Sequence, residues 1–262
     1  MSDAPAPTVT AVHPTAHART RVRTDLGFVH AASLGFCPVT VRELDHACAN
    51  YPVVFLKDAQ TGRFRCVALL GFAADENLFA TVRDGRASWN ATYAPETVRR
   101  YPFSLGIQGD APDATPTVLC IADDPAVVND TTGERLFDDQ GGETPYLAAM
   151  KRMLAGLIDG ERDTTARIDA LVAHRLLREI AIALTHRSGK THRLEGVYST
   201  DREALAALDD GDVAALHRSG ALALAQASAA SLAQVTRLVQ LKNLRTDDPI
   251  VGVRAETPQS AL

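Results

Sequence analysis

The segment WNATYAPETVRRYPF, from Trp89 to Phe103, constrains the fold more than any other part of this chain. It contains the only tryptophan of the sequence, two of its five tyrosines and two prolines. Pro95 can begin a helical turn, because a backbone N–H at that position has no partner within the helix. Pro102 must end the turn, since the residue before a proline is biased away from helical backbone angles. The sequence therefore predicts one helical turn over 96–100.

Two adjacent arginines, Arg99 and Arg100, lie in this turn. Neighbouring side chains point about 100° apart around a helix, so the two are not expected to serve the same partner. We expect one arginine to pair with the acidic loop at 138–143, which is a structural role. The other is expected to present its planar guanidinium to a carboxylate or a phosphate.

The aromatic residues of the segment have two alternative roles. Their rings can stack on a ligand, or they can fill the core. With the arginines and a histidine from the second half of the chain, they form the predicted ligand site: Trp89, Tyr93, Arg99, Arg100, Tyr101 and His217. No catalytic residues are predicted, because no serine or cysteine stands out as an activated nucleophile.

Hydrophobic periodicity predicts strands in the first half of the chain and mostly helices in the second. The predicted strands lie at 53–57, 64–72, 77–82, 117–122 and, as a hairpin, 179–199. The predicted helices lie at 40–49, 147–158, 164–176, 202–208, 211–218 and 221–243. These elements indicate an α+β fold in which a mostly antiparallel sheet, from two hairpin regions, packs with C-terminal helices.

The same pattern predicts one domain between two unstructured ends. Residues 1–24 are rich in Ala, Pro and Thr without periodicity, so we expect a disordered arm. Residues 25–245 are predicted to form a single domain, sheet-rich over 25–145 and helix-rich over 146–245. Residues 246–262 are expected to form a flexible tail.

Composition narrows the classes of partner. The net charge of −5 argues against a nucleic-acid partner, which would need a basic surface. No run of 18 apolar residues is present, so no transmembrane segment is expected. The first 24 residues lack the apolar core of a secretory signal, and the four cysteines form no CxxC pair. We therefore expect a soluble, cytoplasmic protein.

Motifs that carry known chemistry are incomplete or missing. Ser188-Gly189-Lys190-Thr191 is similar to the end of a phosphate-binding loop, but Leu184 stands where the full pattern requires a glycine. The patterns GxGxxG, GxSxG and HExxH do not occur. No histidine pair has ligand spacing on a predicted helix, since Pro14 lies between His13 and His17, so no metal site is predicted and the cofactor is unknown.

Several short motifs occur in a specific order along the chain. They are YPVVF (51–55), ALLGF (68–72), ENLF (76–79), W-x3-Y-x-P…RRYPF (89–103), LCI (119–121), GERLF (133–137), LEGVYSTD (194–201) and LHRSGALALAQASAASL (216–232). By this set the sequence resembles the bacterial SapC-like family over residues 26–240. The resemblance implies an association with surface layers or peptide transport, and it implies no catalytic residues.

Three functions follow as hypotheses. The first is an accessory protein that binds a peptide, a small metabolite or a protein partner in a surface-layer or uptake-associated system. The alternative is an uncharacterised enzyme, such as a metal- or flavin-linked oxidoreductase, with His217 and one of the two arginines in its site. A second alternative is a structural component of a surface layer. An oligomer is possible, and whether the protein is an enzyme is left open.

Overall fold

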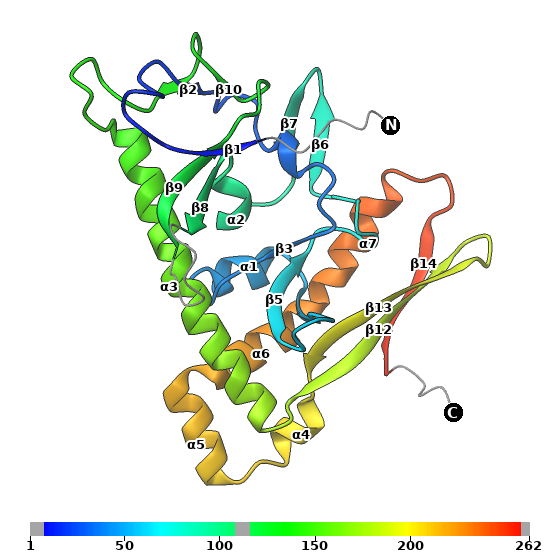
Figure 1. Ribbon diagram of the computed structural model, residues 1–262. Coiled ribbons are helices and arrows are strands. Elements are labelled where there is room, and N and C mark those ends of the chain that lie inside the picture. The colour runs from blue at the N-terminus through cyan, green and yellow to red at the C-terminus, as the bar shows by residue number, and fades with distance from the viewer. Residues whose placement is uncertain (1–7, 108–115, 258–262) are drawn as a thin grey trace. The chain divides into compact units, whose positions relative to one another are not determined.

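The computed structural model describes residues 8–107 and 116–257, drawn as a coloured ribbon in Figure 1. The contacts divide the chain into two compact units. The first comprises the described residues of 1–30, 82–88 and 96–158, and the second comprises those of 31–81, 89–95 and 159–262. The first unit contains two small antiparallel sheets and the second unit one larger antiparallel sheet.

The first unit contains two small sheets, with strand orders β1-β9-β8 and β10-β2-β11. The strand bounds are β1 (Val9–Ala11), β2 (Arg21–Val22), β8 (Phe103–Ile107), β9 (Pro116–Ala122), β10 (Val128–Asn129) and β11 (Glu134–Arg135). The 3-10 turn η1 (Val29–Ala31) follows β2 in the chain, and the single turn α2 (Glu96–Arg99) precedes β8. Residues 145–158 of the long helix α3 (Pro145–Ala173) complete the unit.

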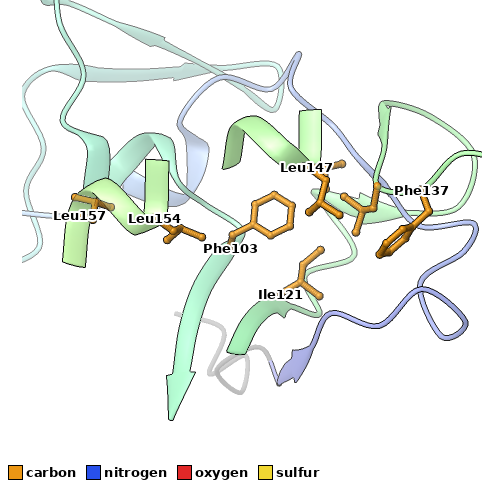
Figure 2. Packing of buried hydrophobic residues seen from close by; sticks show 8 residues of the cluster. Phe103, Ile121, Phe137, Leu147, Leu154 and Leu157 are labelled. Atoms are coloured by element: carbon orange, nitrogen blue, oxygen red, sulfur yellow. The ribbon is translucent and has the colours of Figure 1, made fainter. Parts of the chain in front are cut away.

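The core of the first unit lies where α3 packs on the β8–β9 pair. Phe103 of β8 is 1% exposed and lies opposite Ile121 of β9 in the strand register. Figure 2 shows these two side chains and Leu147 of α3 pointing toward one another. The buried cluster consists of Val22, Phe103, Ile121, Leu136, Phe137, Leu147, Leu154 and Leu157.

The second unit is built on a six-stranded antiparallel sheet with the order β14-β12-β13-β4-β5-β3. The strand bounds are β3 (Phe36–Pro38), β4 (Val53–Lys57), β5 (Phe64–Leu69), β12 (Leu177–His186), β13 (Thr191–Thr200) and β14 (Ile250–Glu256). The β4–β5 and β12–β13 hairpins join through β4 and β13, where Leu56 lies opposite Val197. In Figure 1, β14 (red) lies beside β12.

Helices of the second unit pack around this sheet. Their bounds are α1 (Leu44–Asn50), α4 (Arg202–Ala206), α5 (Asp210–Ser219), α6 (Ala221–Ser231), the 3-10 turn η2 (Leu232–Gln234) and α7 (Val235–Asn243). The alanine-rich helix α6 contacts β4 and β13, because its small side chains allow a close approach to the strands. The hydroxyl of Ser231 accepts the Val53 N–H at 2.8 Å, which attaches the end of α6 to β4.

A two-stranded hairpin leads into the segment Trp89–Phe103. It consists of β6 (Ala80–Arg83) and β7 (Arg86–Trp89), and its turn is formed by Asp84 and Gly85. Both turn residues have positive φ angles, of 50° and 74°. Two-residue hairpin turns with this geometry favour Asp-Gly, as the sequence predicts for this turn.

The predicted fold class is confirmed. The sheets are antiparallel, the two predicted hairpin regions form β4–β5 and β12–β13, and helices dominate the C-terminal half. The single domain predicted over 25–245 stays a prediction, because contacts inside each unit do not test whether the two units fold as one.

The two ends differ from the expectation of a disordered arm at 1–24 and a flexible tail at 246–262. Strand β1 pairs with β9, and β2 pairs with both β10 and β11. Strand β14 pairs with β12 along most of its length, with Val253 opposite Leu184. Strands of two or three residues are too short to show alternation, so the N-terminal pairs left no periodic signal. Residues 1–7 and 258–262 lie outside the described part of the chain.

Candidate functional site

The predicted site residues divide between the two units. Trp89 and Tyr93 belong to the second unit, whereas Arg99, Arg100 and Tyr101 belong to the first. His217 lies in the second unit on the exposed surface of α5. The residues are therefore considered as separate groups.

Trp89 is held in place by a chain of hydrogen bonds. Its Nε1–H donates to the Tyr51 hydroxyl at 2.8 Å and to the Tyr93 carbonyl at 3.2 Å. The Tyr51 hydroxyl in turn donates to the Tyr93 carbonyl. Tyr51 is fully buried, and this burial raises the pKa of its hydroxyl. The orientation of the indole ring is thus fixed by the buried Tyr51 hydroxyl and by the Tyr93 backbone.

Tyr93 extends the same chain into the protein. Its hydroxyl donates to the Glu43 carboxylate at 2.7 Å, and Glu43 is only 3% exposed. The Tyr93 ring stacks on His46 with 5.0 Å between centroids. The hydroxyl and the ring of Tyr93 both have protein partners. Tyr93 therefore has a structural role, which is to hold its carbonyl in place as an acceptor for Trp89.

A cavity of about 340 Å³ lies beside Trp89 in the second unit. Phe79 also lines it, and its ring stacks against the indole at 6.4 Å between centroids. The remaining lining residues are mostly small or polar: Ala49, Asn50, Asn90, Ala91, Thr92, Gln234 and Arg237. His217 is not among the residues that line this cavity.

The polar groups of this cavity are oriented by hydrogen bonds. Arg237 Nη2 donates to Asn90 Oδ1 at 2.9 Å, and Gln234 Nε2 donates to the Ala49 carbonyl at 2.9 Å. The side-chain oxygen of Asn50 accepts both the N–H and the hydroxyl of Thr92. An arginine, three carboxamides and an indole therefore line one preformed pocket, in which aromatic surface and oriented polar groups are combined as in small-ligand sites.

The arginine pair of the first unit behaves differently from the prediction. Arg100 is half-buried and its Nη1 donates to the Phe103 carbonyl at 2.8 Å, while burial lowers the pKa of its guanidinium. Arg99 is exposed. The acidic loop finds other partners, since Asp139 pairs with Arg135 at 2.6 Å and Glu143 pairs with Lys151. The predicted pairing of Arg99 or Arg100 with this loop is wrong, because the ion-pair partners of the loop in the described part of the chain are Arg135 and Lys151.

Tyr101 has protein partners at both its hydroxyl and its ring. The hydroxyl donates to Asp124 Oδ2 at 2.6 Å, and burial raises the pKa of this hydroxyl. The ring stacks on His30 at 4.1 Å between centroids. His30 Nε2 donates to the Val98 carbonyl at 3.0 Å, and burial lowers the pKa of its imidazole. Tyr101 thus fastens η1 and the loop after β9 to the α2 turn.

The two arginines give a first test. Arg100→Ala removes the bond to Phe103 and the packed stem of the side chain, so we expect it to lower the free energy of unfolding by about 1–2 kcal/mol. Arg99→Ala is expected to change it by less than about 0.5 kcal/mol, because the side chain is exposed. Urea unfolding of both variants is the measurement, and equal losses would contradict this assignment of roles.

Sequence reasoning found Trp89 but missed Asn50, Gln234 and Arg237. These residues approach Trp89 only through folding, and no local spacing marks them. Among the described residues, no group of three or more His, Cys, Asp or Glu side chains is arranged to hold a metal ion. None of the helices in the described part of the chain is long and apolar enough to cross a membrane.

Comparison with known proteins gives one match. A family model described as SapC matches residues 12–238. No curated protein and no solved structure matches the chain.

Proposed function

The chain belongs to the SapC family, and on that premise we propose that it is an accessory protein that binds a peptide or a small metabolite in the pocket beside Trp89. The observation that carries this proposal is the pocket itself. Its indole wall is fixed by the buried Tyr51 hydroxyl, and its polar side chains are already oriented without a ligand. Preformed sites avoid part of the entropic cost of binding.

The donors of the pocket favour a ligand with a carboxylate or an amide. The Arg237 guanidinium has five N–H donors, one of which is bonded to Asn90. A planar guanidinium matches the two oxygens of a carboxylate. The neighbouring Trp89 ring can cover the apolar part of the same ligand. A short peptide with a free carboxyl end combines both features.

The cellular setting is part of the proposal. We place the protein in the cytoplasm, in a surface-layer or uptake-associated system, where a protein partner or an oligomer is possible. All four cysteines, Cys37, Cys48, Cys66 and Cys120, are thiols, as is usual in a reducing compartment. The association with surface layers or uptake rests on the family resemblance.

Trp89 provides a direct test, because it is the only tryptophan of the chain and its fluorescence reports on this pocket alone. The probe is a pool of dipeptides with free carboxyl ends, compared with the same pool as C-terminal amides. We expect a saturable change of fluorescence that is stronger with the free acids. Arg237→Ala is expected to weaken binding about tenfold, since it removes a charge-assisted contact.

Arg218→Ala is the matched control, because Arg218 is an exposed arginine on α5 of the same unit and does not line the cavity. It should bind the pool as the unaltered protein does. A fluorescence signal that does not saturate, or equal affinity in Arg237→Ala, would contradict the proposal.

A further inference from the structure

A second cavity of about 340 Å³ lies in the second unit, between the turn end of the β12–β13 hairpin and the segment that joins α7 to β14. Its apolar lining includes Phe72, Leu184 and Ile250. The charged and titratable side chains that line it come from the loop after β5, the β12–β13 hairpin, α7 and the loop before β14: Glu76, His186, Lys190, His192, Lys242 and Asp248. None of these six residues lines the pocket beside Trp89.

The two carboxylates of this cavity already have donors on both oxygens. Asp248 Oδ1 accepts the Ser188 N–H at 2.9 Å, and Oδ2 accepts the Ser188 hydroxyl at 2.6 Å. These bonds lower the pKa of the Asp248 carboxyl group, so it is held as a carboxylate. Glu76 accepts the Phe72 N–H at 3.0 Å with one oxygen and Lys242 Nζ with the other. Both acids are therefore committed to protein donors.

Both imidazole rings are held by backbone carbonyl groups. His186 Nδ1 donates to the Asp248 carbonyl at 2.9 Å, and His192 Nε2 donates to the Phe72 carbonyl at 3.2 Å. A carbonyl oxygen only accepts, so these bonds fix which nitrogen carries a proton. The second nitrogen of each ring is left to bond elsewhere, and it becomes a donor when the ring is protonated.

The two ammonium groups retain most of their donors. Each ammonium has three N–H groups, and Lys242 gives one of them to Glu76. Within the described residues, Lys242 pairs with Glu76, whereas Lys190 is in no ion pair within 4 Å, although its charge helps to lower the pKa of the Asp248 carboxyl group. The two lysines thus bring more N–H donors into the cavity than its two carboxylates occupy.

A surplus of donors in a preformed cavity is complementary to a group that only accepts. We propose that this cavity binds the oxyanion group of a small molecule, a phosphate or a carboxylate, between Lys190, Lys242 and the two histidines. The Ser188-Gly189-Lys190-Thr191 segment takes part as a hairpin turn that presents Lys190, with Gly189 at a φ of 85°. It does not form a phosphate-binding loop, because it joins two strands and precedes no helix.

Inorganic phosphate is the probe for the test, and the imidazole signals of His186 and His192 in NMR spectra are the readout. We expect both signals to shift saturably with added phosphate at constant ionic strength. The signals of His46 and His217, which do not line the cavity, are expected to stay in place. Titration with acetate distinguishes a carboxylate site from a phosphate site, since the stronger binder identifies the oxyanion.

Two lysine variants complete the experiment. Lys190→Gln is expected to weaken oxyanion binding about tenfold, because the ammonium charge is lost while a polar, uncharged side chain remains. Lys57→Gln is the matched control, since Lys57 lies over the Phe64 ring and outside the cavity. The proposal is overturned if neither anion gives saturable shifts at His186 and His192, or if Lys190→Gln binds as tightly as Lys57→Gln.

Discussion

Replacing Phe103 with alanine is expected to lower the free energy of unfolding by about 3–5 kcal/mol. The ring is 1% exposed and lies at the centre of the cluster in Figure 2, between Ile121 of β9 and residues of α3. The ring of Tyr146 lies 6.0 Å away and is tilted against it. Because these neighbours are anchored in a strand and a helix, they cannot fill the cavity that the truncation leaves.

Urea unfolding followed by far-UV circular dichroism measures this loss. Phe103→Leu keeps most of the volume and is expected to cost less than about 1.5 kcal/mol. Phe36→Ala removes the same ring from a residue that is 43% exposed, so its smaller loss controls for the chemistry of the change. A loss for Phe103→Ala no larger than that for Phe36→Ala would contradict the burial argument.

The same variant also tests the single domain predicted from the sequence. Phe103 belongs to the first unit, whereas Trp89 belongs to the second. If the units unfold as one domain, the midpoint seen by Trp89 fluorescence should move as far as the midpoint seen by circular dichroism. If they unfold separately, the fluorescence midpoint should stay in place.

The elements that the sequence predicts well have local causes. The hairpin at 179–199 combines alternating apolar residues with a Ser188-Gly189 turn, and both signals act within a few residues. Helices α4 and α5 begin at aspartates, where Asp201 accepts the Ala204 N–H at 3.1 Å and Asp209 accepts the Asp212 N–H at 2.8 Å. Such caps can be read directly from the sequence.

The long helix α3 shows where local reasoning fails. The sequence predicts two separate helices, at 147–158 and 164–176, but a single helix spans Pro145–Ala173. A Cβ atom at Gly160 would lie 2.8 Å from the hydroxyl of Thr40. Glycine therefore permits the approach of Thr40, a residue far away in sequence, and does not end the helix.

The candidate site was predictable only in part for the same reason. The concentration of aromatic residues marks Trp89, and the pocket does lie beside it. Its polar wall comes from Gln234 and Arg237, which are separated from Trp89 by about half the chain and carry no motif. His217 was selected for its chemistry alone, and the structure places it on an exposed helix surface away from the lining of the pocket.

Replacing Asn77 with alanine is expected to cost about 3 kcal/mol or more, although no charge and little volume are lost. Asn77 is 3% exposed, and its Nδ2 donates to the Ala31 carbonyl at 2.7 Å. Its Oδ1 accepts the N–H groups of Phe79 and Ala80 at 2.9 and 3.1 Å. The substitution removes the acceptor of the Phe79 and Ala80 N–H groups, whereas the Ala31 carbonyl still accepts the Leu34 N–H at 3.1 Å. Each buried group that loses its partner costs about 1–3 kcal/mol.

The effect should reach the pocket, because Phe79 lines it and packs edge-on against Tyr51 at 4.7 Å. We therefore expect Asn77→Ala to change the emission of Trp89 in the folded protein as well as the urea midpoint.

Asn129→Ala is the matched control, since Asn129 Oδ1 accepts two backbone N–H groups in the same way, from Thr131 and Thr132, but at an exposed turn. Water can replace those bonds, so that variant should lose less than about 1 kcal/mol. Equal losses in the two variants would show that burial does not set the cost, and an unchanged Trp89 emission would separate Asn77 from the binding pocket.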